Sequence, residues 1–448
     1  AADTAISHRL RWVIAAAVVL AVIFLSGGIY PFYSGVILLV LYSVMDAAAV
    51  KKVVPLAAVF AILMLAVILS SVKLLPVVDF TSGVSAEKDT QLTSAGIVMK
   101  SLLSREQSIA KKDLETGRDL VPEGRQKYYD TLAGKIPWGW HEYSAYVGII
   151  PLFLAALSIA NFRRNWKLIV SAVFFLWLAL GTYLPFGPWQ LLRELPFFSS
   201  LHGHSRFVIV FAFFVALLAA KALSSLKISG NRNIQTAVAV ALCIIVAVDL
   251  LLVSRPLLST AFPITPLEIR STTLGSPEFI QLLSSAPYAS QYPNLLQGIG
   301  TLNCYERLHL KIRPLPQFVD GVPYKGFIGN AYIAETNKSL NFSQFSPQKI
   351  SLKLPEIKSE LTLVINQNYY KGWKANGRKA LSFNGLLAVK VNPADSGKEV
   401  TFRFSSPPFI FGSVISILSV IAAVGMFWKP SKTARVVKKV QSLVFRQS

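Results

Sequence analysis

The sequence predicts a polytopic α-helical membrane protein with about eight transmembrane helices and an extracytoplasmic β-sandwich-like domain inserted before the last helix. Of its 448 residues, 53% are hydrophobic and only 15% are charged, whereas soluble domains carry about 25% charged residues. The hydrophobic residues form blocks of about 20, long enough to cross the ~30 Å hydrocarbon layer of a bilayer as helices. A long polar segment with short alternating strands separates the last two blocks.

Eight apolar blocks are the predicted spans. They lie at residues 12–29, 34–49, 53–73, 144–161, 166–184, 206–224, 234–253 and 408–428. The first block is not a signal peptide, because it has no cleavage site and another apolar block follows at once. The spans divide the chain into three transmembrane helices in 1–73, a loop with an amphipathic helix in 74–143, four transmembrane helices in 144–254, a β-rich domain in 255–407, the last transmembrane helix in 408–428 and a basic tail in 429–448.

The net charge of +22 comes from short clusters of Lys and Arg between alternate apolar blocks. The clusters do not form one patch with interleaved aromatics, which argues against nucleic-acid binding. An excess of Lys and Arg marks the cytoplasmic loops of membrane proteins. The clusters are Arg9 and Arg11; Lys51 and Lys52; Arg163, Arg164 and Lys167; Lys227 and Arg232; and the tail from Lys429 to Arg446. Both termini are therefore predicted to be cytoplasmic, with 74–143 and 255–407 outside.

The segment 74–143 is too long for a plain loop. Leu92, Gly96, Met99 and Leu102 recur near helical spacing among basic residues. This pattern predicts an amphipathic helix on the membrane face. A short soluble helix that packs on the neighbouring domain is the alternative.

The segment 255–407 has the composition of a small β-sandwich. Short alternating runs are separated by turn signals such as Asn376-Gly377 and Asn384-Gly385, a spacing typical of sandwiches. The predicted strands are 350–354, 361–365, 386–391 and 400–404. The earlier part, 255–330, is less regular, and we expect a helix near Ser276–Leu283.

The chain has no phosphate-binding glycine loop, zinc-protease or hydrolase-elbow motif. Its two cysteines, Cys243 in an apolar block and Cys304 in a polar segment, do not indicate a disulfide framework. Candidate site residues are therefore sought among polar groups at the outer membrane face.

Two acids are candidates for proton transfer. Glu142 follows Trp138-Gly-Trp140-His141 just before the fourth span, and Asp79 follows the third. A carboxylate with an imidazole partner can act as a general base. The alternatives are an aromatic belt with incidental polar neighbours for Glu142, and an ordinary solvated helix end for Asp79.

Four basic side chains are candidates for phosphate or other substrate binding, together with His141. They are Arg193, His202, His204 and Arg206. The planar guanidinium of Arg206 matches phosphate oxygens, although cations near a span end also extend to the interface without a ligand. His202 and His204 could chelate a metal, but no third ligand is evident, so no metal site is predicted.

Four aromatic side chains could stack on sugar: Trp138, Trp140, Tyr370 and Trp373. For Tyr370 and Trp373, burial inside the sandwich is the alternative. Asp249 lies within the seventh span, where acids are functional candidates. It is also close enough to the outer end to reach water or Arg255.

Several short segments occur in an order and spacing that resembles a known family. They are Leu74-Leu75-Pro76; Glu142-Tyr143-Ser144-Ala145-Tyr146-Val147-Gly148; Leu180-Gly181; Leu195-Pro196-Phe197-Phe198; Ser205-Arg206-Phe207; and Tyr369-Tyr370-Lys371-Gly372-Trp373-Lys374-Ala375. Together, from about residue 55 to 430, they resemble the YfhO-type bacterial membrane proteins of the C-type, polyprenyl-phosphate-dependent glycosyltransferase superfamily. Two positions depart from that family's pattern: Lys371 stands where Pro is common, and His202-Gly203-His204 replaces an Arg-x-Pro stretch.

The resemblance implies an enzyme of the bacterial cytoplasmic (inner) membrane. It would transfer a sugar from a polyprenyl-phosphate-linked donor to an envelope glycan or protein acceptor, surrounded by membrane lipids. Asp79 or Glu142 would be the acid/base, and Arg206 and Arg193 would hold the phosphate. A divalent cation is the one cofactor left open.

The family usually carries a catalytic acid in its first outer loop. Here that loop is Ile29–Ser34, which contains no acid. Because family members also tend to be longer, we expect this chain to be the C-terminal part of a longer protein. The alternative is a short relative that has lost catalysis.

Two other functions compete with glycosyl transfer. A non-catalytic membrane protein could bind or assemble envelope polymers through 255–407. A transporter or flippase would place polar groups near the membrane midplane, where the first six spans have almost none.

Overall fold

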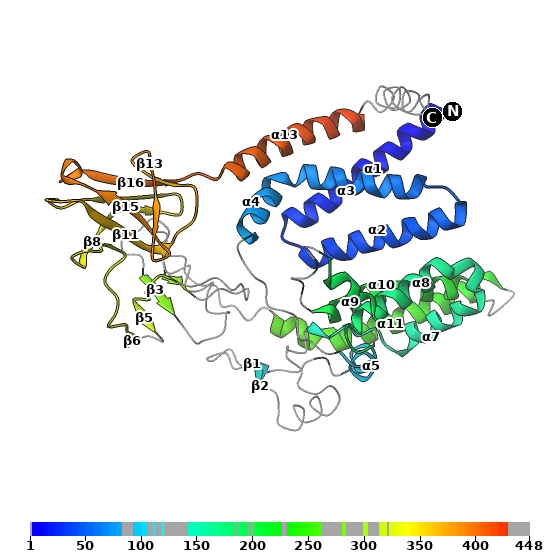
Figure 1. The fold of residues 1–448 in the computed structure, drawn as a ribbon. Coiled ribbons are helices and arrows are strands. Elements are labelled where there is room, and N and C mark those ends of the chain that lie inside the picture. The colour runs from blue at the N-terminus through cyan, green and yellow to red at the C-terminus, as the bar shows by residue number, and fades with distance from the viewer. Residues whose placement is uncertain are drawn as a thin grey trace.

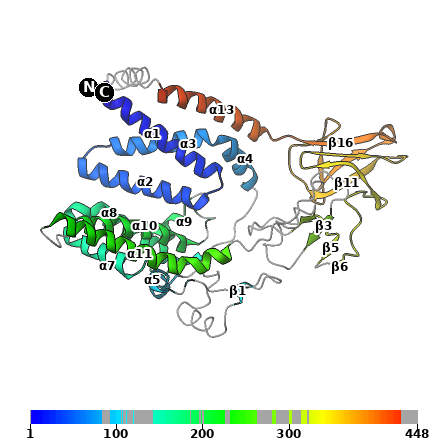
Figure 2. The ribbon, with the colours of Figure 1, turned by 180° about the vertical axis from the view of Figure 1, so that it is seen from behind.

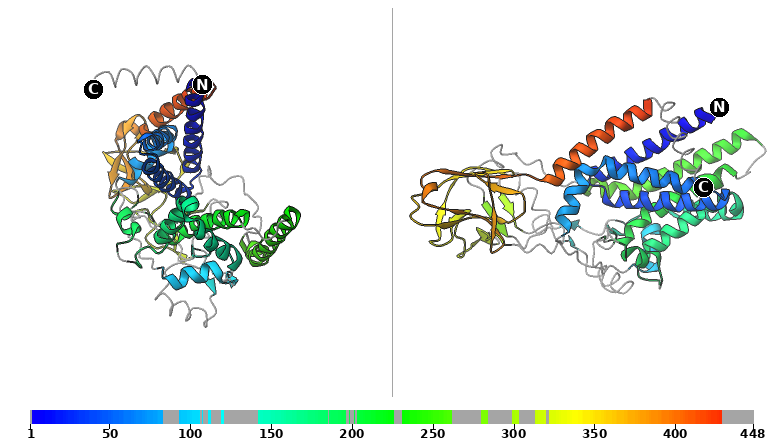
Figure 3. Two further views of the ribbon diagram at one scale, coloured as in Figure 1. Left: turned by 90° about the vertical axis from the view of Figure 1, so that its right-hand side faces the viewer. Right: turned by 45° about the horizontal axis from the view of Figure 1, so that its top comes forward.

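A computed structural model describes most of the chain. The described residues are 2–82, 93–105, 107, 111–112, 119–120, 142–184, 186–195, 198, 201, 203–225, 231–261, 280–283, 299–302, 313–319 and 322–428. They form a group of helices with a β-sandwich beyond one end of it (Figure 1; Figure 3, right).

Every predicted apolar block is helical over most of its length. The helices are α1 (Ala2–Leu25), α2 (Ile29–Val50), α3 (Val54–Leu69), α4 (Ser71–Thr81), α7 (Ile149–Leu157), α8 (Phe162–Ala179), α10 (Val208–Ser225), α11 (Arg232–Ala261) and α13 (Pro407–Trp428). In the described part of the chain, four helices are long and apolar enough to cross a membrane: Ile29–Val50, His204–Ser225, Arg232–Arg255 and Pro407–Trp428. The bent pair α3 and α4 would make a fifth. The chain is thus built as a membrane protein with a sheet domain, while eight spans stay a prediction.

Three predicted spans differ from the prediction in continuity or in length. The third is broken near Ser70, where α3 and α4 meet at 80°. The fourth is non-helical over 144–148 and ends in the 3-10 turn Ser158–Asn161. The seventh continues to Ala261, past the predicted boundary at 254. The predicted first outer loop, Ile29–Ser34, is the first turn of α2, because a proline in the first helical turn displaces no helical hydrogen bond.

The helices form two packed groups (Figures 1 and 2). α1 and α3 share one core, which Ala423 of α13 also enters. α2, α7, α8 and α10 share another, around the buried rings of Phe175 and Phe214. Many large apolar side chains point outward instead, such as Phe411, Ile417 and Ile421 on α13. Such a surface would be unstable in water over this area, so it agrees with a lipid surround.

The elbow between α3 and α4 is closed by α13. The side chains of Ser70 and Ser71 donate back to the carbonyls of Ala66 and Val67, an arrangement that bends helices. The freed amide of Val72 donates to Ser416 Oγ on α13 at 3.0 Å. α13 turns a face of small buried residues inward, namely Gly412, Ser416, Ser419 and Ala423. Small residues at this spacing let helix backbones approach closely in membranes.

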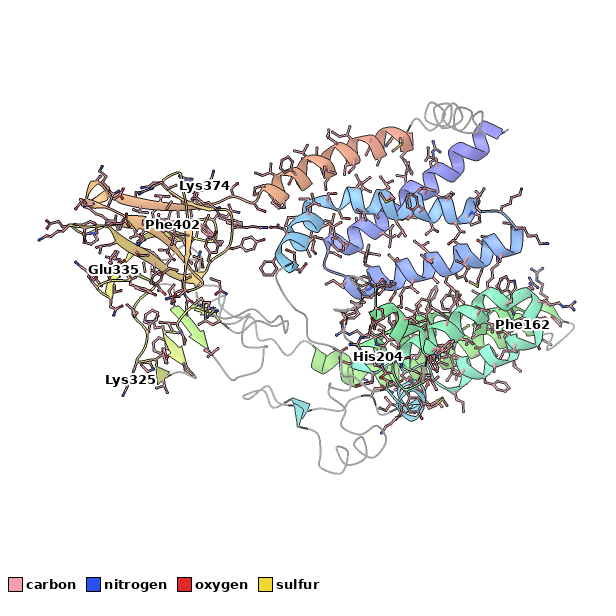
Figure 4. All side chains as sticks on the ribbon, in the orientation of Figure 1. Phe162, His204, Lys325, Glu335, Lys374 and Phe402 are labelled. Carbon is pink, nitrogen blue, oxygen red and sulfur yellow. The ribbon has the colours of Figure 1, made fainter. Side chains whose placement is uncertain are left out.

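Basic side chains cap helix ends across the bundle. Lys73 Nζ donates to the carbonyls of Phe24 and Leu25 at 3.0 and 3.1 Å, and Arg11 Nε donates to the Phe427 carbonyl at 3.2 Å. These carbonyls lack helical partners. The start of α1, the end of α13 and Phe162 all lie at the end of the helices away from the sandwich (Figure 4).

The predicted amphipathic helix is present as α5 (Ala95–Leu103). Its apolar face, with Ile97, Val98 and Leu102, is buried and contributes to the core around α8 and α10. The amides of Val147 and Gly148 both donate to the Leu102 carbonyl. The helix therefore packs on the neighbouring helices, which was the alternative interpretation.

Two five-stranded antiparallel sheets form the sandwich. Their orders are β13-β12-β16-β10-β9 and β14-β15-β11-β7-β8. The strands are β7 (Ala331–Ile333), β8 (Lys338–Leu340), β9 (Phe342–Ser346), β10 (Lys349–Lys353), β11 (Leu361–Asn368), β12 (Trp373–Ala375), β13 (Arg378–Lys379), β14 (Leu381–Phe383), β15 (Leu386–Val391) and β16 (Glu399–Phe404). The four predicted strands match β10, β11, β15 and β16. Both predicted Asn-Gly turns have positive φ at both residues, as tight hairpins require.

A smaller sheet contacts β11 through Gln281, whose side-chain amide donates to the Asn366 carbonyl at 2.9 Å. Its order is β4-β3-β5-β6, with β3 (Ile280–Leu283), β4 (Ile299–Thr301), β5 (Phe318–Val319) and β6 (Val322–Pro323). Asn366 joins the layers, since its side chain exchanges two hydrogen bonds with the Leu315 backbone at 2.8 Å. The predicted helix near Ser276–Leu283 is wrong over 280–283, because this run pairs in parallel with β4 and β5. Pairing across the chain outweighs a short local preference.

We expect Gly412→Leu to destabilise the helical domain. A Cβ at Gly412 would lie 2.3 Å from the Ser71 carbonyl oxygen, and such overpacking costs about 1–3 kcal/mol. Gly425→Leu is the matched control on the same helix, because nothing lies within 4 Å of its Cβ position. The check is the melting temperature in detergent, and equal values for the two variants would contradict this packing.

Candidate functional site

A cavity of about 920 Å³ lies where α4 and the start of α13 meet the sandwich. Its lining is Pro76, Phe80, Arg313, Gln348, Asn368, Tyr369, Tyr370, Gly385, Phe404, Ser405, Ser406, Phe409 and Ile410. Five of these residues are aromatic, and the polar groups are two amides, two serine hydroxyls, two phenols and one guanidinium. Concave sites of this size with few placed polar groups are typical of small-ligand pockets.

Asp79 connects the helical domain to the sandwich beside this cavity. Tyr370 Oη donates to Asp79 Oδ2 at 2.7 Å, and Lys371 Nζ donates to Asp79 Oδ1 at 2.5 Å. The Tyr370 ring also contacts Phe80, the next residue of α4, at 5.9 Å between centroids. Two predicted site residues, Asp79 and Tyr370, are thus brought together across 291 positions of sequence.

These contacts keep the Asp79 carboxylate ionised. The hydrogen bonds from Lys371 and Tyr370 lower the pKa of Asp79 below its ordinary 3.8. Burial, and then the hydrogen bond to Asp79, raises the pKa of the Tyr370 phenol to about 12. At neutral pH the site therefore presents a carboxylate and a neutral phenol.

The Tyr370 turn is held by the start of α13. Gly372 has φ +109°, and a Cβ there would lie 2.4 Å from the Ser405 carbonyl oxygen. The Ser405 amide donates to the Gly372 carbonyl at 3.1 Å. Only glycine accepts this close approach without strain. The turn that carries Tyr370 and Lys371 is therefore fixed to Ser405, two residues before α13 begins at Pro407.

Arg313 is a cavity residue that the sequence patterns did not identify. Its amide donates to Asn368 Oδ1 at 3.1 Å. Its side chain lies on the hairpin between β14 and β15, where a Cβ at Gly385 would lie 2.7 Å from Arg313 Cγ. The glycine of the Asn384-Gly385 turn thus leaves space for a guanidinium at the cavity. No local signal links residue 313 to that turn.

Glu142 forms a separate site with Arg206. Arg206 Nε and Nη2 donate to the two Glu142 oxygens at 2.5 and 2.6 Å. The guanidinium also lies 3.8 Å from the centre of the Tyr30 ring, a favourable cation–π arrangement. Ser205 Oγ donates to the Glu142 carbonyl at 2.7 Å. This bidentate pair joins the start of α2, the segment before α7 and the turn before α10.

The predicted phosphate-binding role of Arg206 therefore faces competition from Glu142. A phosphate would have to displace a carboxylate that already occupies the planar fork.

Arg193, the last residue of α9 (Pro188–Arg193), forms no ion pair among the described residues. His204 is fully buried against the Trp189 ring, and a Cβ at Gly181 would lie 2.1 Å from its Nε2. Its imidazole lies inside the helical group (Figure 4) and is closed to solvent.

Trp373 differs from Tyr370 although the two belong to one motif. Trp373 is 7% exposed and packs in the sandwich core against Phe404. The alternative interpretation, burial inside the sandwich, therefore holds for the Trp373 ring. The prediction that Trp373 stacks on a sugar is wrong, because neither face of the ring is open to a ligand.

Trp138, Trp140, His141 and His202 lie outside the described residues. The described residues contain no group of three or more potential metal-ligating side chains.

Asp249 forms a third polar cluster at the outer part of α11. Tyr146 Oη donates to Asp249 Oδ2 at 2.6 Å, and Arg105 Nη2 lies 3.2 Å from Oδ1. A Cβ at Gly148 would approach Asp249 Oδ2 to 3.1 Å. The acid is thus satisfied by Arg105 and Tyr146, and it ties α5 and the segment before α7 to α11.

Comparison of the chain with protein-family models, with curated proteins and with solved structures finds no match.

The Asp79 contact makes the attachment of the sandwich dependent on pH. Because its folded-state pKa is lowered, the stabilisation is complete above the unfolded value of 3.8 and is lost as pH falls through the lower folded value. We expect the difference in sandwich melting temperature between the native protein and Asp79→Asn to stay constant above about pH 5 and to shrink below it. In Lys371→Gln, where the folded-state pKa of Asp79 is less lowered, the loss should be smaller and should be complete at a higher pH. A difference that disappears near neutral pH would contradict the assignment.

The Glu142–Arg206 pair should show strong energetic coupling. We expect a cycle of Glu142→Gln and Arg206→Gln to give a coupling energy of about 2 kcal/mol, between the values for exposed and buried pairs. Equilibrium unfolding in mixed micelles would measure it. The exposed pair Lys390–Glu360, at 3.7 Å, is the control and should give less than about 0.5 kcal/mol. Similar values for both pairs would count against a structural role for Glu142 and Arg206.

Proposed function

We propose that this chain is a membrane glycosyltransferase-like protein that transfers a sugar from a polyprenyl-phosphate-linked donor to an envelope glycan or protein. The observation that supports this best is the position of Asp79 and Tyr370 beside the cavity between α4, the sandwich and α13. The order of short motifs described above, which resembles the YfhO-type proteins, suggests the class of reaction.

The cavity suits a sugar linked to phosphate. Tyr369, Tyr370, Phe404 and Phe409 offer aromatic faces, and flat apolar faces pack on the C–H face of a sugar ring. Asn368 and Gln348 can share hydrogen bonds with hydroxyl groups. Arg313 supplies a planar cation for phosphate oxygens. Because α4 and α13 both border the cavity, a lipid-anchored donor could enter from the membrane side.

Asp79 is proposed as the general base. The acceptor hydroxyl would pass its proton to the carboxylate as its oxygen bonds to the anomeric carbon. The bond from that carbon to the phosphate oxygen breaks, and the phosphate leaves with the electron pair, its charge offset by Arg313. Since the pKa of Asp79 is lowered, the base is ionised throughout the neutral range and works by proximity and orientation.

Glu142 and Arg206 are proposed to position the helices that border the site. Each satisfies the other in a bidentate pair, with 12% and 33% of their side chains exposed. Neither group lines the cavity, whereas Pro76 and Phe80, on the same helix as Asp79, and its partner Tyr370 do. This assigns the acid/base role to Asp79 among the two predicted acids.

The sandwich is proposed to lie outside the cytoplasm, with both termini inside. The α2–α3 turn and the start of α8, which carry basic clusters, lie at the opposite end of the helices from the sandwich (Figure 1). The positive-inside rule assigns that end to the cytoplasm of a bacterial inner membrane.

A second function is favoured by one feature of the same contact. Asp79 already accepts two hydrogen bonds from the sandwich, so its role could be to attach a binding domain. In that case the chain would hold an envelope polymer without chemistry.

Asp79→Asn tests the two functions. The amide keeps the hydrogen bond from Tyr370 but cannot take a proton, so we expect sugar transfer to fall by about 100-fold or more while the protein remains folded. The measurement is the sugar content of envelope polymers in a deletion strain that carries each variant.

Asp395→Asn is the matched control, because Asp395 is another acid with a lowered pKa, bound to Arg378 away from the cavity. Full activity in both variants would rule out Asp79 as the base. If Asp79→Asn instead releases polymer that copurifies with the native protein, the binding function is the correct one.

A further inference from the structure

The outer face of the β16 sheet carries a row of four cations. In the strand register, Lys379 lies opposite Lys374, Lys374 opposite Arg403, and Arg403 opposite Lys349. Residues directly opposite in an antiparallel sheet point to the same face. With strands about 4.8 Å apart, the row spans about 15 Å. We call Lys379, Lys374, Arg403 and Lys349 the basic row.

The basic row faces away from the core. Its neighbours along the strands, Trp373, Ala375, Phe402 and Ile350, are buried between the two sheets. Three of the four cations are exposed and Lys349 is partly exposed. Figure 4 shows Lys374 on the outside of this sheet and Phe402 between the sheets.

Such a row is unfavourable for the isolated sheet. Like charges directly opposite each other destabilise a strand pair, and this happens at three successive pairs. Among the described residues, no carboxylate lies within ion-pair distance of the four side chains. The sandwich from 322 to 406 carries 12 Lys and Arg against five Asp and Glu, so the local field does not offset the row.

The next positions on the same face are neutral hydrogen-bonding groups. Thr401 and Ser351 lie opposite each other with hydroxyls 2.8 Å apart, and Gln344 lies opposite Ser351. The acid Glu399 follows two positions beyond Thr401 and accepts a hydrogen bond from Ser343. Cations beside hydroxyl and amide groups suit an anionic chain that also carries hydroxyls.

The cations of the basic row are exposed or partly exposed on this face. The outer face of the other sheet contacts the smaller sheet and the segment around Leu315 through Asn366. The strands of the basic row run toward α13, so the face lies roughly parallel to the helices and points sideways (Figures 1 and 2). A bilayer crossed by those helices would not lie flat against it. The row is therefore better placed for a free polymer than for lipid headgroups.

We propose that the basic row binds a linear polyanionic glycan, with negative groups spaced along the chain at a few ångströms. Each anion would bridge neighbouring cations and remove the repulsion between them. Hydroxyls of the glycan would meet Thr401 and Gln344, which are partly and fully exposed. This inference does not depend on sugar transfer at the cavity.

The test uses the full chain in nanodiscs of phosphatidylcholine and polygalacturonate as the probe, with neutral dextran as the control polymer. We expect salt-dependent binding of polygalacturonate and none of dextran. The variant Lys374→Gln/Arg403→Gln should bind about tenfold more weakly, as expected for two exposed charge contacts. The matched variant Lys338→Gln/Lys358→Gln removes two exposed cations elsewhere on the sandwich and should change affinity less than twofold.

A second readout is stability without ligand. Removing like charges from adjacent strands should leave the melting temperature of Lys374→Gln/Arg403→Gln unchanged or raised. Should that variant misfold, Lys379→Gln on the edge strand β13 takes its place in the binding assay. Equal binding by both double variants would overturn the proposal. If phosphatidylglycerol vesicles bind through the row while polygalacturonate and inorganic polyphosphate do not, the partner is a lipid surface. That result would also overturn the proposal.

Discussion

The close contact between Gly412 of α13 and the α3–α4 elbow is the constraint on which the rest of the arrangement depends. The elbow turns α4 by 80° away from α3, which directs Asp79 toward the sandwich. α13 holds the elbow through the missing side chain of Gly412 and the hydrogen bond from Val72 to Ser416. The same helix continues directly from β16. One close helix contact thus sets the position of the carboxylate and of the domain that meets it.

Ionic contacts in this chain join elements that are remote in sequence. Asp79 joins α4 to the Tyr370 turn, Glu142 joins the segment before α7 to Arg206, and Asp249 joins α11 to Arg105. Each lies near the sandwich side of the helices, where charges are less costly than at the centre of a bilayer. The acids are few, and these three have cationic partners. The Asp79 partner Tyr370 lines a cavity of about 920 Å³ that also contains Arg313 and Asn368. The Asp249 partner Tyr146 lines an apolar cavity of about 470 Å³, so the surroundings rather than the residue type separate the two acids.

Local patterns predicted the elements well and their contacts poorly. Apolar blocks predicted the helices because burial in lipid needs about 20 apolar residues, and alternation predicted β10, β11, β15 and β16. The break at Ser70 was missed, since a Ser-Ser pair bends a helix only when a partner such as Ser416 accepts the freed amide. The run Ile280–Leu283 was assigned to a helix because four apolar-rich residues do not distinguish helix from strand.

At the candidate site too, local patterns identified single residues but not the contacts between residues remote in sequence. Asp79 and Tyr370 were both candidates, yet no local pattern links two residues that are 291 positions apart. Trp373 is three residues from Tyr370 but lies on the core side of β12, because strand side chains alternate between faces. No sequence pattern pointed to Arg313, and its side chain reaches the cavity because Gly385 leaves space for it.

The link between the sandwich and α13 is two residues long, Ser405 and Ser406, between β16 and Pro407. The Ser405 amide is bonded to Gly372, and Asp79 ties the sandwich to α4 a short distance away. The domain is therefore held at two points and has little freedom to swing. A force applied to the sandwich would therefore pass into α13 and load the close contact between Gly412 and Ser71.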